Sequence, residues 1–165
     1  MNERDTIVRC LYDNLGKQYE WAGISPATGF DCSGLAYYCY GWAGVPLSRG
    51  SVQQWDNARF AGQEIPVAKA QPGDLIFWGH HQADHVGIVS KPGWVINALN
   101  EGLGVRETRI GGAYGIPLLG AASILSKGVS QPPTHQPPEP TIPSNPEPDR
   151  PKRQRRKNRR KEDQR

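Results

Sequence analysis

The chain has 165 residues and only 36% are hydrophobic, which is enough for one ordinary domain but too polar for a chain packed throughout. Residues 150–165 hold ten basic residues against two acidic ones, a net +8, whereas residues 1–149 carry ten against 14, a net −4. The overall charge of +4 therefore comes from the C-terminal tail, and the part expected to fold is mildly acidic.

Neither end of the expected domain contains a membrane or export signal. The opening residues MNERDTIVRC mix charges of both signs and lack the apolar core, about 7–15 residues long, that a secretory signal needs. The longest weakly polar run, 116–125, is far shorter than the roughly 18 residues that span a bilayer. We therefore expect a cytoplasmic protein, a phage-associated protein, or one exported by a signal-independent route.

Three cysteines are too few for a disulfide framework. If Cys32 and Cys39 share a helix, a rise of about 1.5 Å per residue separates them by roughly 10 Å, beyond the ~7 Å limit for a disulfide. A bond between Cys10 and Cys39 stays open. At least one cysteine is then unpaired, and an unpaired cysteine is a candidate for chemistry.

Three helices are expected first along the chain. Residues 5–15 have apolar side chains at helical spacing and end at Gly16. After a loop rich in glycine and polar residues, a second helix is expected to begin near Cys32. A third, 51–58, is expected to have Ser51 as its N-cap.

Short β-rich runs separated by turn residues follow Pro72 and Gly73. They cover 74–79, 85–90, 94–99, 104–110 and 118–125. Helices followed by closely spaced strands predict an α+β fold, in which the N-terminal helices pack on a small antiparallel β-sheet. We expect the domain to cover 1–126, followed by a proline-rich linker over 127–149 and a disordered basic tail over 150–165.

Cys32 is the candidate nucleophile. At a helix N-terminus, backbone N–H groups and the helix dipole favour thiolate and can later hold an oxyanion. Such a nucleophile needs a base, and His85 opens a predicted strand that would hold its ring in place. If 85–90 and 94–99 form a hairpin, Asn97 lies beside His85 and accepts its other ring N–H. A buried structural cysteine and a structural histidine are the alternatives.

A zinc site is a further alternative, because His80, His81, Asp84 and His85 are all possible ligands. The spacing of His81 and His85 presents both to one metal only on a helix, and here the segment crosses a turn. The pattern therefore favours the cysteine chemistry over a metal.

Four segments in order resemble the NlpC/P60 family of cysteine peptidases. FDCSGLAYYCYGWAGVPLSRGSVQQW resembles its nucleophile segment and GKQYEWAG its upstream G-x-x-Y-x-W-G-G element. AQPGDLIFWG and HVGIV are similar to two of its strands, so the resemblance covers roughly 5–125. It implies a papain-like α+β fold, with the cysteine at a helix N-terminus against the sheet.

The resemblance also implies roles for individual residues. Cys32 would be the nucleophile, His85 the base, and Asn97 the third polar residue, where the family most often has histidine. Tyr19 matches a tyrosine near the oxyanion site and substrate pocket. Asp31 and Ser33 match positions that contact the free amine of an N-terminal L-Ala, although Asp31 also fits a plain N-cap.

Trp21 and Trp78 flank the predicted site in sequence and are candidates to line the cleft. In place of the family's Gly-Gly pair the chain has Ala22-Gly23, so the loop is expected to differ slightly.

The activity implied by the resemblance is hydrolysis of a peptide bond in peptidoglycan stem peptides, between γ-D-glutamate and the diamino acid, through an acyl-enzyme. No metal or organic cofactor is needed. An amidase or acyltransferase on the same scaffold and a non-catalytic wall-binding or virion structural module are the alternatives. The basic tail, unless functionally neutral, is expected to bind anionic wall polymer, a membrane surface or nucleic acid.

Overall fold

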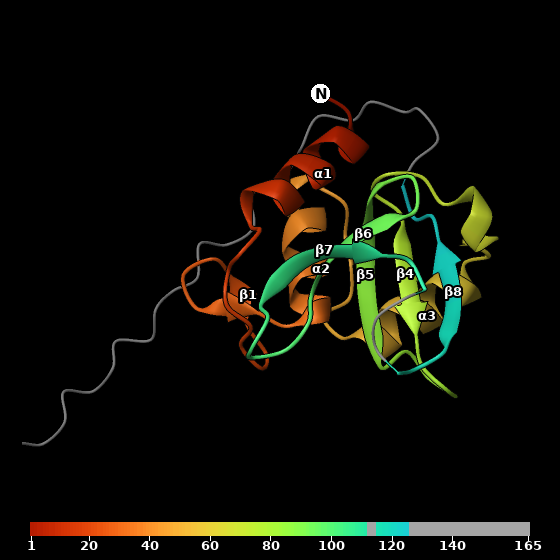
Figure 1. The fold of residues 1–165 in the computed structure, drawn as a ribbon. Helices are drawn as coiled ribbons and strands as arrows, with labels where there is room; N and C mark the ends of the chain where they lie inside the picture. The colour runs from red at the N-terminus through yellow and green to blue at the C-terminus, as the bar shows by residue number, and fades with distance from the viewer. Residues whose placement is uncertain (112–114, 126–165) are drawn as a thin grey trace, which may run out of the picture.

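The computed structural model of the protein describes residues 1–111 and 115–125, in which three α-helices precede and pack against an antiparallel sheet (Figure 1). The helices are α1 (Glu3–Asp13), α2 (Cys32–Trp42) and α3 (Ser51–Phe60), with a 3₁₀ turn η1 at Val67–Lys69. The main strands are β4 (Leu75–Trp78), β5 (His85–Lys91), β6 (Trp94–Ala98), β7 (Val105–Arg109) and β8 (Leu118–Ala122). The expected α+β class is therefore confirmed.

The six-stranded sheet has the order β3-β8-β4-β5-β6-β7, where β3 is the short strand Glu64–Ile65, and every neighbouring pair is antiparallel. Alternate residues of β4 point to opposite faces. Leu75 and Phe77 join the main core beneath the helices, whereas Ile76 and Trp78 join a smaller apolar cluster. Apolar residues therefore pack on both faces of the sheet, which explains why β4 is apolar throughout rather than alternating.

Three short strands were not anticipated from the sequence. They are β1 (Ile24–Ser25), β2 (Gly29–Phe30) and β3 (Glu64–Ile65). Each is two residues long, so no alternation of polar and apolar residues develops within it. The first two form a small separate sheet in the loop before α2.

The start of the third helix differs from the expectation. Gly50, not Ser51, occupies the N-cap, and Ser51 is the first helical residue. The hydroxyl of Ser51 donates instead to the backbone oxygen of Ala83, at 2.7 Å. The Ser51 hydroxyl, which the sequence predicted to cap the helix, therefore makes a hydrogen bond to a distant part of the chain.

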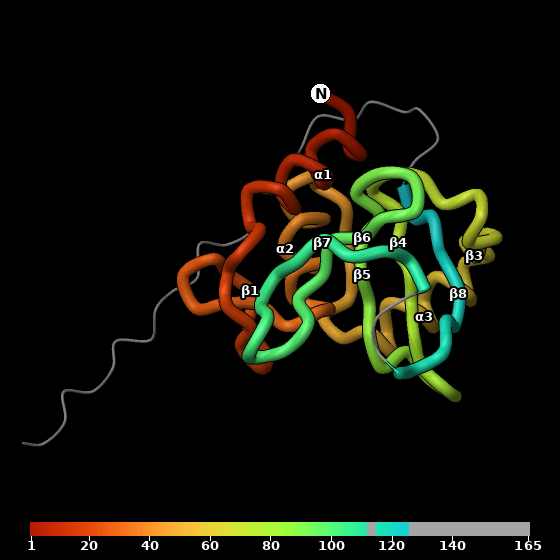
Figure 2. Tube along the Cα trace, in the orientation of Figure 1, coloured from red at the N-terminus to blue at the C-terminus, as the bar shows by residue number. Residues whose placement is uncertain are grey.

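The expected hairpin between β5 and β6 is present, with Ile88 opposite Ile96 and a turn after Lys91. At the other end of β6, the turn into β7 is tied to the N-terminal loop. Lys17 O accepts from Val105 N–H at 2.8 Å, and Val105 O accepts from Gly16 N–H at 2.9 Å. Figure 2 shows the loop before β1 running beside this turn. Gly104 makes the approach possible, because a Cβ there would lie 2.3 Å from Lys17 O.

A disulfide joins Cys10 of α1 to Cys39 of α2, with 5.5 Å between their Cα atoms. This answers the question that the spacing of the cysteines left open, and it leaves Cys32 as a free thiol. Among the residues that the structure describes, no helix has the length and apolar character to cross a bilayer. The expected linker over 127–149 and basic tail over 150–165 lie outside the described residues.

Candidate active site

Cys32 is the first residue of α2, and the helix starts there because Asp31 caps it. The Asp31 Oδ1 atom accepts from Gly34 N–H at 2.6 Å, so one unpaired helix donor is satisfied. Gly34 has no side chain for a steric reason, since a Cβ there would lie 2.0 Å from Gly23 O. The loop before β1 therefore closes directly over the helix start that carries the thiol.

The Cys32 thiol is partly buried, and its surroundings act on its pKa in both directions. Burial raises the pKa most, and the negative charge of Asp31 raises it further. Backbone N–H groups of Val86, Ser33 and Cys32 itself lower it, but the net direction is upward. The N–H groups at the helix start therefore act on the thiol as expected, but burial, which the sequence did not reveal, outweighs them.

His85 is the first residue of β5, and only 8% of it is exposed. Its Nε2 lies 2.8 Å from Oδ1 of Asn97, which is fully buried. The Asn97 amide is oriented by its Nδ2, which donates to Thr108 Oγ1 at 3.2 Å and to Arg106 O at 3.4 Å. Because Oδ1 only accepts, Nε2 carries the ring proton and Nδ1 has the lone pair of a base.

Burial lowers the pKa of His85, and the hydrogen bond with Asn97 partly offsets this by raising it. Part of the burial comes from Trp78, whose ring centroid lies 5.6 Å from that of the imidazole. Trp78 is only 1% exposed, so it does not line a cleft as expected. The alternation along β4 turns it into the smaller core, where it packs against the base.

Val86 links the two candidate groups. It follows His85 at the start of β5, and its N–H is among the donors that act on the Cys32 thiol. The start of α2 and the start of β5 are therefore adjacent, although the two residues are far apart in sequence. Cys32, His85 and Asn97 thus come from three elements that meet at one end of the sheet.

Arg49 is the residue that sequence reasoning missed. Its Nη2 lies 2.7 Å from Asp31 Oδ2 and its Nη1 lies 3.0 Å from Asp31 Oδ1. Its Nη1 also donates to Ser33 Oγ at 2.9 Å. The only signal in the sequence was its place in the run that resembles the family, to which no role was attached. Asp31 and Ser33 were expected to contact the N-terminal amine of the substrate. Both are instead bound to the guanidinium of Arg49.

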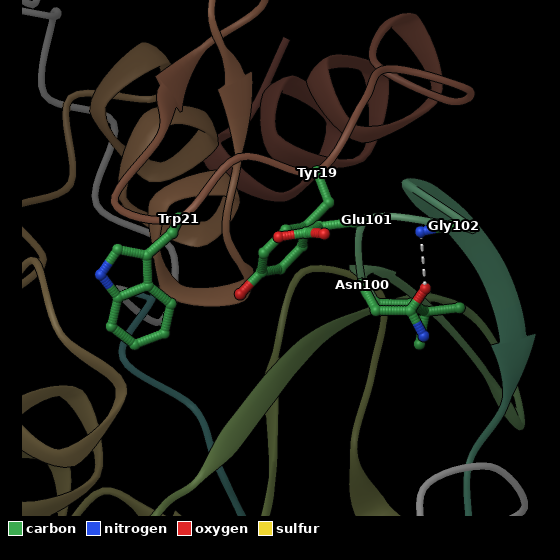
Figure 3. A pocket seen from close by; sticks show the side chains of 6 residues that line it. Tyr19, Trp21, Asn100, Glu101 and Gly102 are labelled. Atoms are coloured by element: carbon green, nitrogen blue, oxygen red, sulfur yellow. Dashed lines mark hydrogen bonds between the residues drawn. The ribbon is translucent and has the colours of Figure 1, made fainter.

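A pocket of about 600 Å³ opens beside this site. It is lined by Tyr19, Trp21, Leu99, Asn100, Glu101 and Gly102. Burial raises the pKa of Tyr19 most, and the charges of the Cys32 thiolate form and of Asp31 raise it further, so this phenol lies near Cys32. Trp21 is 80% exposed, and Figure 3 shows it and Tyr19 projecting from the same loop. Sequence reasoning found these two aromatic residues but took 100–102, on the facing loop, for an ordinary turn and Leu99 for the end of a strand.

The zinc alternative finds no support in the geometry. His80, His81 and Asp84 are exposed, while the ring of His85 is held by Asn97. Within 1–111 and 115–125, no group of three or more histidine, cysteine, aspartate or glutamate residues is arranged to hold a metal ion.

Comparison with known proteins adds to this geometry. The sequence model of the NlpC/P60 family matches residues 16–117. "Probable endopeptidase p60" of Listeria grayi is 36% identical over 108 residues, which are 65% of this chain and 20% of that protein. The chain thus spans about a fifth of that relative's length.

Two solved structures are also similar. The NlpC/p60 domain of the peptidoglycan hydrolase SagA has a TM-score of 0.62 and 32% identity, over 73% of this chain and 98% of that one. RipD of Mycobacterium tuberculosis, described as a non-catalytic NlpC/p60 domain protein adapted to peptidoglycan binding, has a TM-score of 0.62 and 25% identity. That match covers 76% of this chain and 99% of RipD.

Proposed function

The chain belongs to the NlpC/P60 family, and on that premise we propose that it is a cysteine peptidase that hydrolyses a peptide bond in peptidoglycan stem peptides. In this proposal Cys32 is the nucleophile, His85 is the base and Asn97 orients the base. The observation that carries it is the buried hydrogen bond of 2.8 Å between His85 and Asn97, beside the free thiol at the start of α2. A histidine held in one tautomer next to a thiol is the arrangement that nucleophilic catalysis requires.

The two pKa shifts indicate how the reaction would begin. The pKa of Cys32 is raised and that of His85 is lowered, mainly by burial in each case, so the resting pair is thiol and neutral imidazole. His85 Nδ1 would then take the thiol proton as Cys32 Sγ attacks the carbonyl carbon. This is general-base catalysis rather than attack by a preformed thiolate–imidazolium pair.

The remaining steps follow from the same groups. The backbone N–H of Cys32 at the helix start is a donor for the oxyanion of the tetrahedral intermediate. The imidazolium of His85 gives its proton to the leaving amine, and an acyl-enzyme remains on Cys32 Sγ. His85 then removes a proton from water, which attacks the thioester and releases the acid and the free thiol.

The substrate we propose is the bond between γ-D-glutamate and the diamino acid of the stem peptide. Support comes from the names of the relatives, which include an endopeptidase and a peptidoglycan hydrolase. The pocket bounded by Tyr19 and Trp21 has room for part of such a peptide beside the thiol. The ion pair with Arg49 favours the capping role of Asp31 over direct contact with an N-terminal amine.

The test is mass spectrometry of muropeptides and free stem peptides after incubation with wild-type protein, its Cys32 kept as a thiol, or with Cys32→Ala. New products that end in γ-D-glutamate, seen with the wild type alone, are the expected result. Cleavage at another bond would retain the cysteine peptidase but replace the substrate assignment. Equal cleavage by Cys32→Ala would refute the role of the thiol.

A second candidate is a peptidoglycan-binding domain without activity, as described for RipD. The observation that favours it is the similarity to RipD, which shares the fold over 76% of this chain at 25% identity. The digest separates the two candidates: a binding domain sediments with purified wall but releases no peptide from it.

A further inference from the structure

The pocket beside Tyr19 has a single charged lining residue, Glu101. The residue is exposed, and within 1–111 and 115–125 no lysine, arginine or histidine side chain forms an ion pair with it. In the view of Figure 3 its carboxylate overlaps the Tyr19 ring. The negative charge of Glu101 also contributes to the raised pKa of Tyr19, which agrees with this proximity.

The loop that carries Glu101 is held in place by its own backbone and by Asn100. The Asn100 Oδ1 atom accepts from Gly102 N–H at 3.0 Å and from Leu103 N–H at 3.1 Å. The backbone oxygen of Asn100 accepts from Gly104 N–H at 2.8 Å. Gly104 and Val105 are in turn fixed against Lys17, two residues before Tyr19. The two walls of the pocket are therefore joined, and the backbone that carries Glu101 is held in place without a ligand.

The other carboxylate near the thiol, Asp31, has a different environment. Its two oxygens accept from Arg49 and from a helix N–H, so its charge is already compensated within the protein. Glu101 has no such compensation among the described residues. A cationic group of a bound peptide therefore gains more from Glu101 than from Asp31.

We propose that Glu101 binds a primary ammonium group of the stem peptide and thereby determines which peptides the enzyme prefers. The inference rests on the proposed function for the identity of the ligand. Two ammonium groups of a stem peptide fit this chemistry: the free N-terminus of L-Ala and the side-chain amine of the diamino acid. Both are strong hydrogen-bond donors, and their positive charge is opposite to that of the Glu101 carboxylate.

The first test compares kcat/KM on three forms of one peptide: L-Ala-γ-D-Glu-L-Lys, its N-terminally acetylated form and its Nε-acetylated form. A second series has the same three forms with meso-diaminopimelate in place of lysine. In wild type we expect one acetylation to lower kcat/KM about fivefold, the scale of a partly exposed ion pair. In Glu101→Gln the acetylated and free peptides should be cleaved equally well. The acetylation that has the effect identifies which ammonium group is bound.

Asp56→Asn is the matched control, because it removes the same charge from an exposed position on α3, outside the pocket. It should retain the full preference of the wild type. Raising the ionic strength should reduce the preference in wild type and leave Glu101→Gln unchanged. A preference that survives in Glu101→Gln would overturn the inference, as would wild type that cleaves all three forms equally.

A binding experiment, which needs no catalysis, tests this inference independently of the proposed function. Cys32→Ala, with and without Glu101→Gln, is titrated with the same peptides by calorimetry. Tighter binding of the ammonium form that disappears with Glu101→Gln supports the inference, even if wild type cleaves nothing and the proposed function fails. Equal binding of free and acetylated peptides, or no binding of either, overturns the inference whatever the outcome of the digest.

Discussion

Replacing Asn97 with alanine is the sharpest perturbation of the proposed catalytic machinery. Asn97 is fully buried, and its Oδ1 is the partner of His85 Nε2 at 2.8 Å. The substitution leaves a buried ring N–H without that acceptor. The imidazole is then free to rotate or change tautomer, and either change takes Nδ1 away from the thiol.

The size of the effect follows from the cost of that lost contact. Leaving a buried donor without a partner costs about 1–3 kcal/mol. If the whole of this energy is lost from the stabilisation of the transition state, kcat/KM falls about fivefold to 150-fold. Asn97→His should retain more activity than Asn97→Ala, because a ring nitrogen can take the place of the amide oxygen as acceptor.

The pH profile distinguishes orientation of the base from a general loss of structure. The hydrogen bond with Asn97 raises the pKa of His85 against the lowering effect of burial. Its removal lowers that pKa further, so neutral imidazole persists to lower pH. We therefore expect the acid limb of kcat/KM for Asn97→Ala to move to lower pH while the plateau falls. A lower plateau with an unmoved limb, or an unchanged plateau, would refute the role given to Asn97.

Two further predictions concern stability. Ala22 has a φ of 61°, a left-handed conformation that costs a residue with a Cβ about 1–2 kcal/mol. Ala22→Gly should therefore raise the free energy of unfolding by about 0.5–1 kcal/mol after the greater unfolded-state entropy of glycine is subtracted, and a lower Tm in calorimetry would contradict this. Reduction of the Cys10–Cys39 disulfide, which spans 29 residues, should lower the free energy of unfolding by about 3.5 kcal/mol. Urea unfolding with and without reductant measures it, and coincident transitions would show that the bond contributes nothing.

Much of the site was predictable because its key residues begin regular elements. Asp31 and Cys32 stand at a helix start, and His85 opens a strand, so local patterns are enough to place both. The contact between His85 and Asn97 followed from a short hairpin, in which a two-residue turn, Pro92 and Gly93, joins the strands. Each of these inferences depends on residues close together in the chain.

The features that sequence reasoning missed all depend on long-range contacts. Arg49 reaches Asp31 from a loop, and no periodicity marks a loop residue as an ion-pair partner. Trp78 was placed in the cleft because it is near His85 in sequence, but the pleat of β4 turns it into the core. The net pKa of Cys32 depends on how deeply the sheet buries the helix start, and that depth is a property of the complete fold.

The disulfide has a practical consequence for assays of the proposed activity. The chain has three cysteines, and with Cys10 and Cys39 bonded to each other Cys32 is the only thiol left. A chromogenic thiol reagent added to the native, oxidised protein therefore counts one group per chain, and that group is the proposed nucleophile. The concentration of free Cys32 thiol can be titrated directly, so any measured rate of cleavage can be normalised to chains that carry this thiol instead of to total protein.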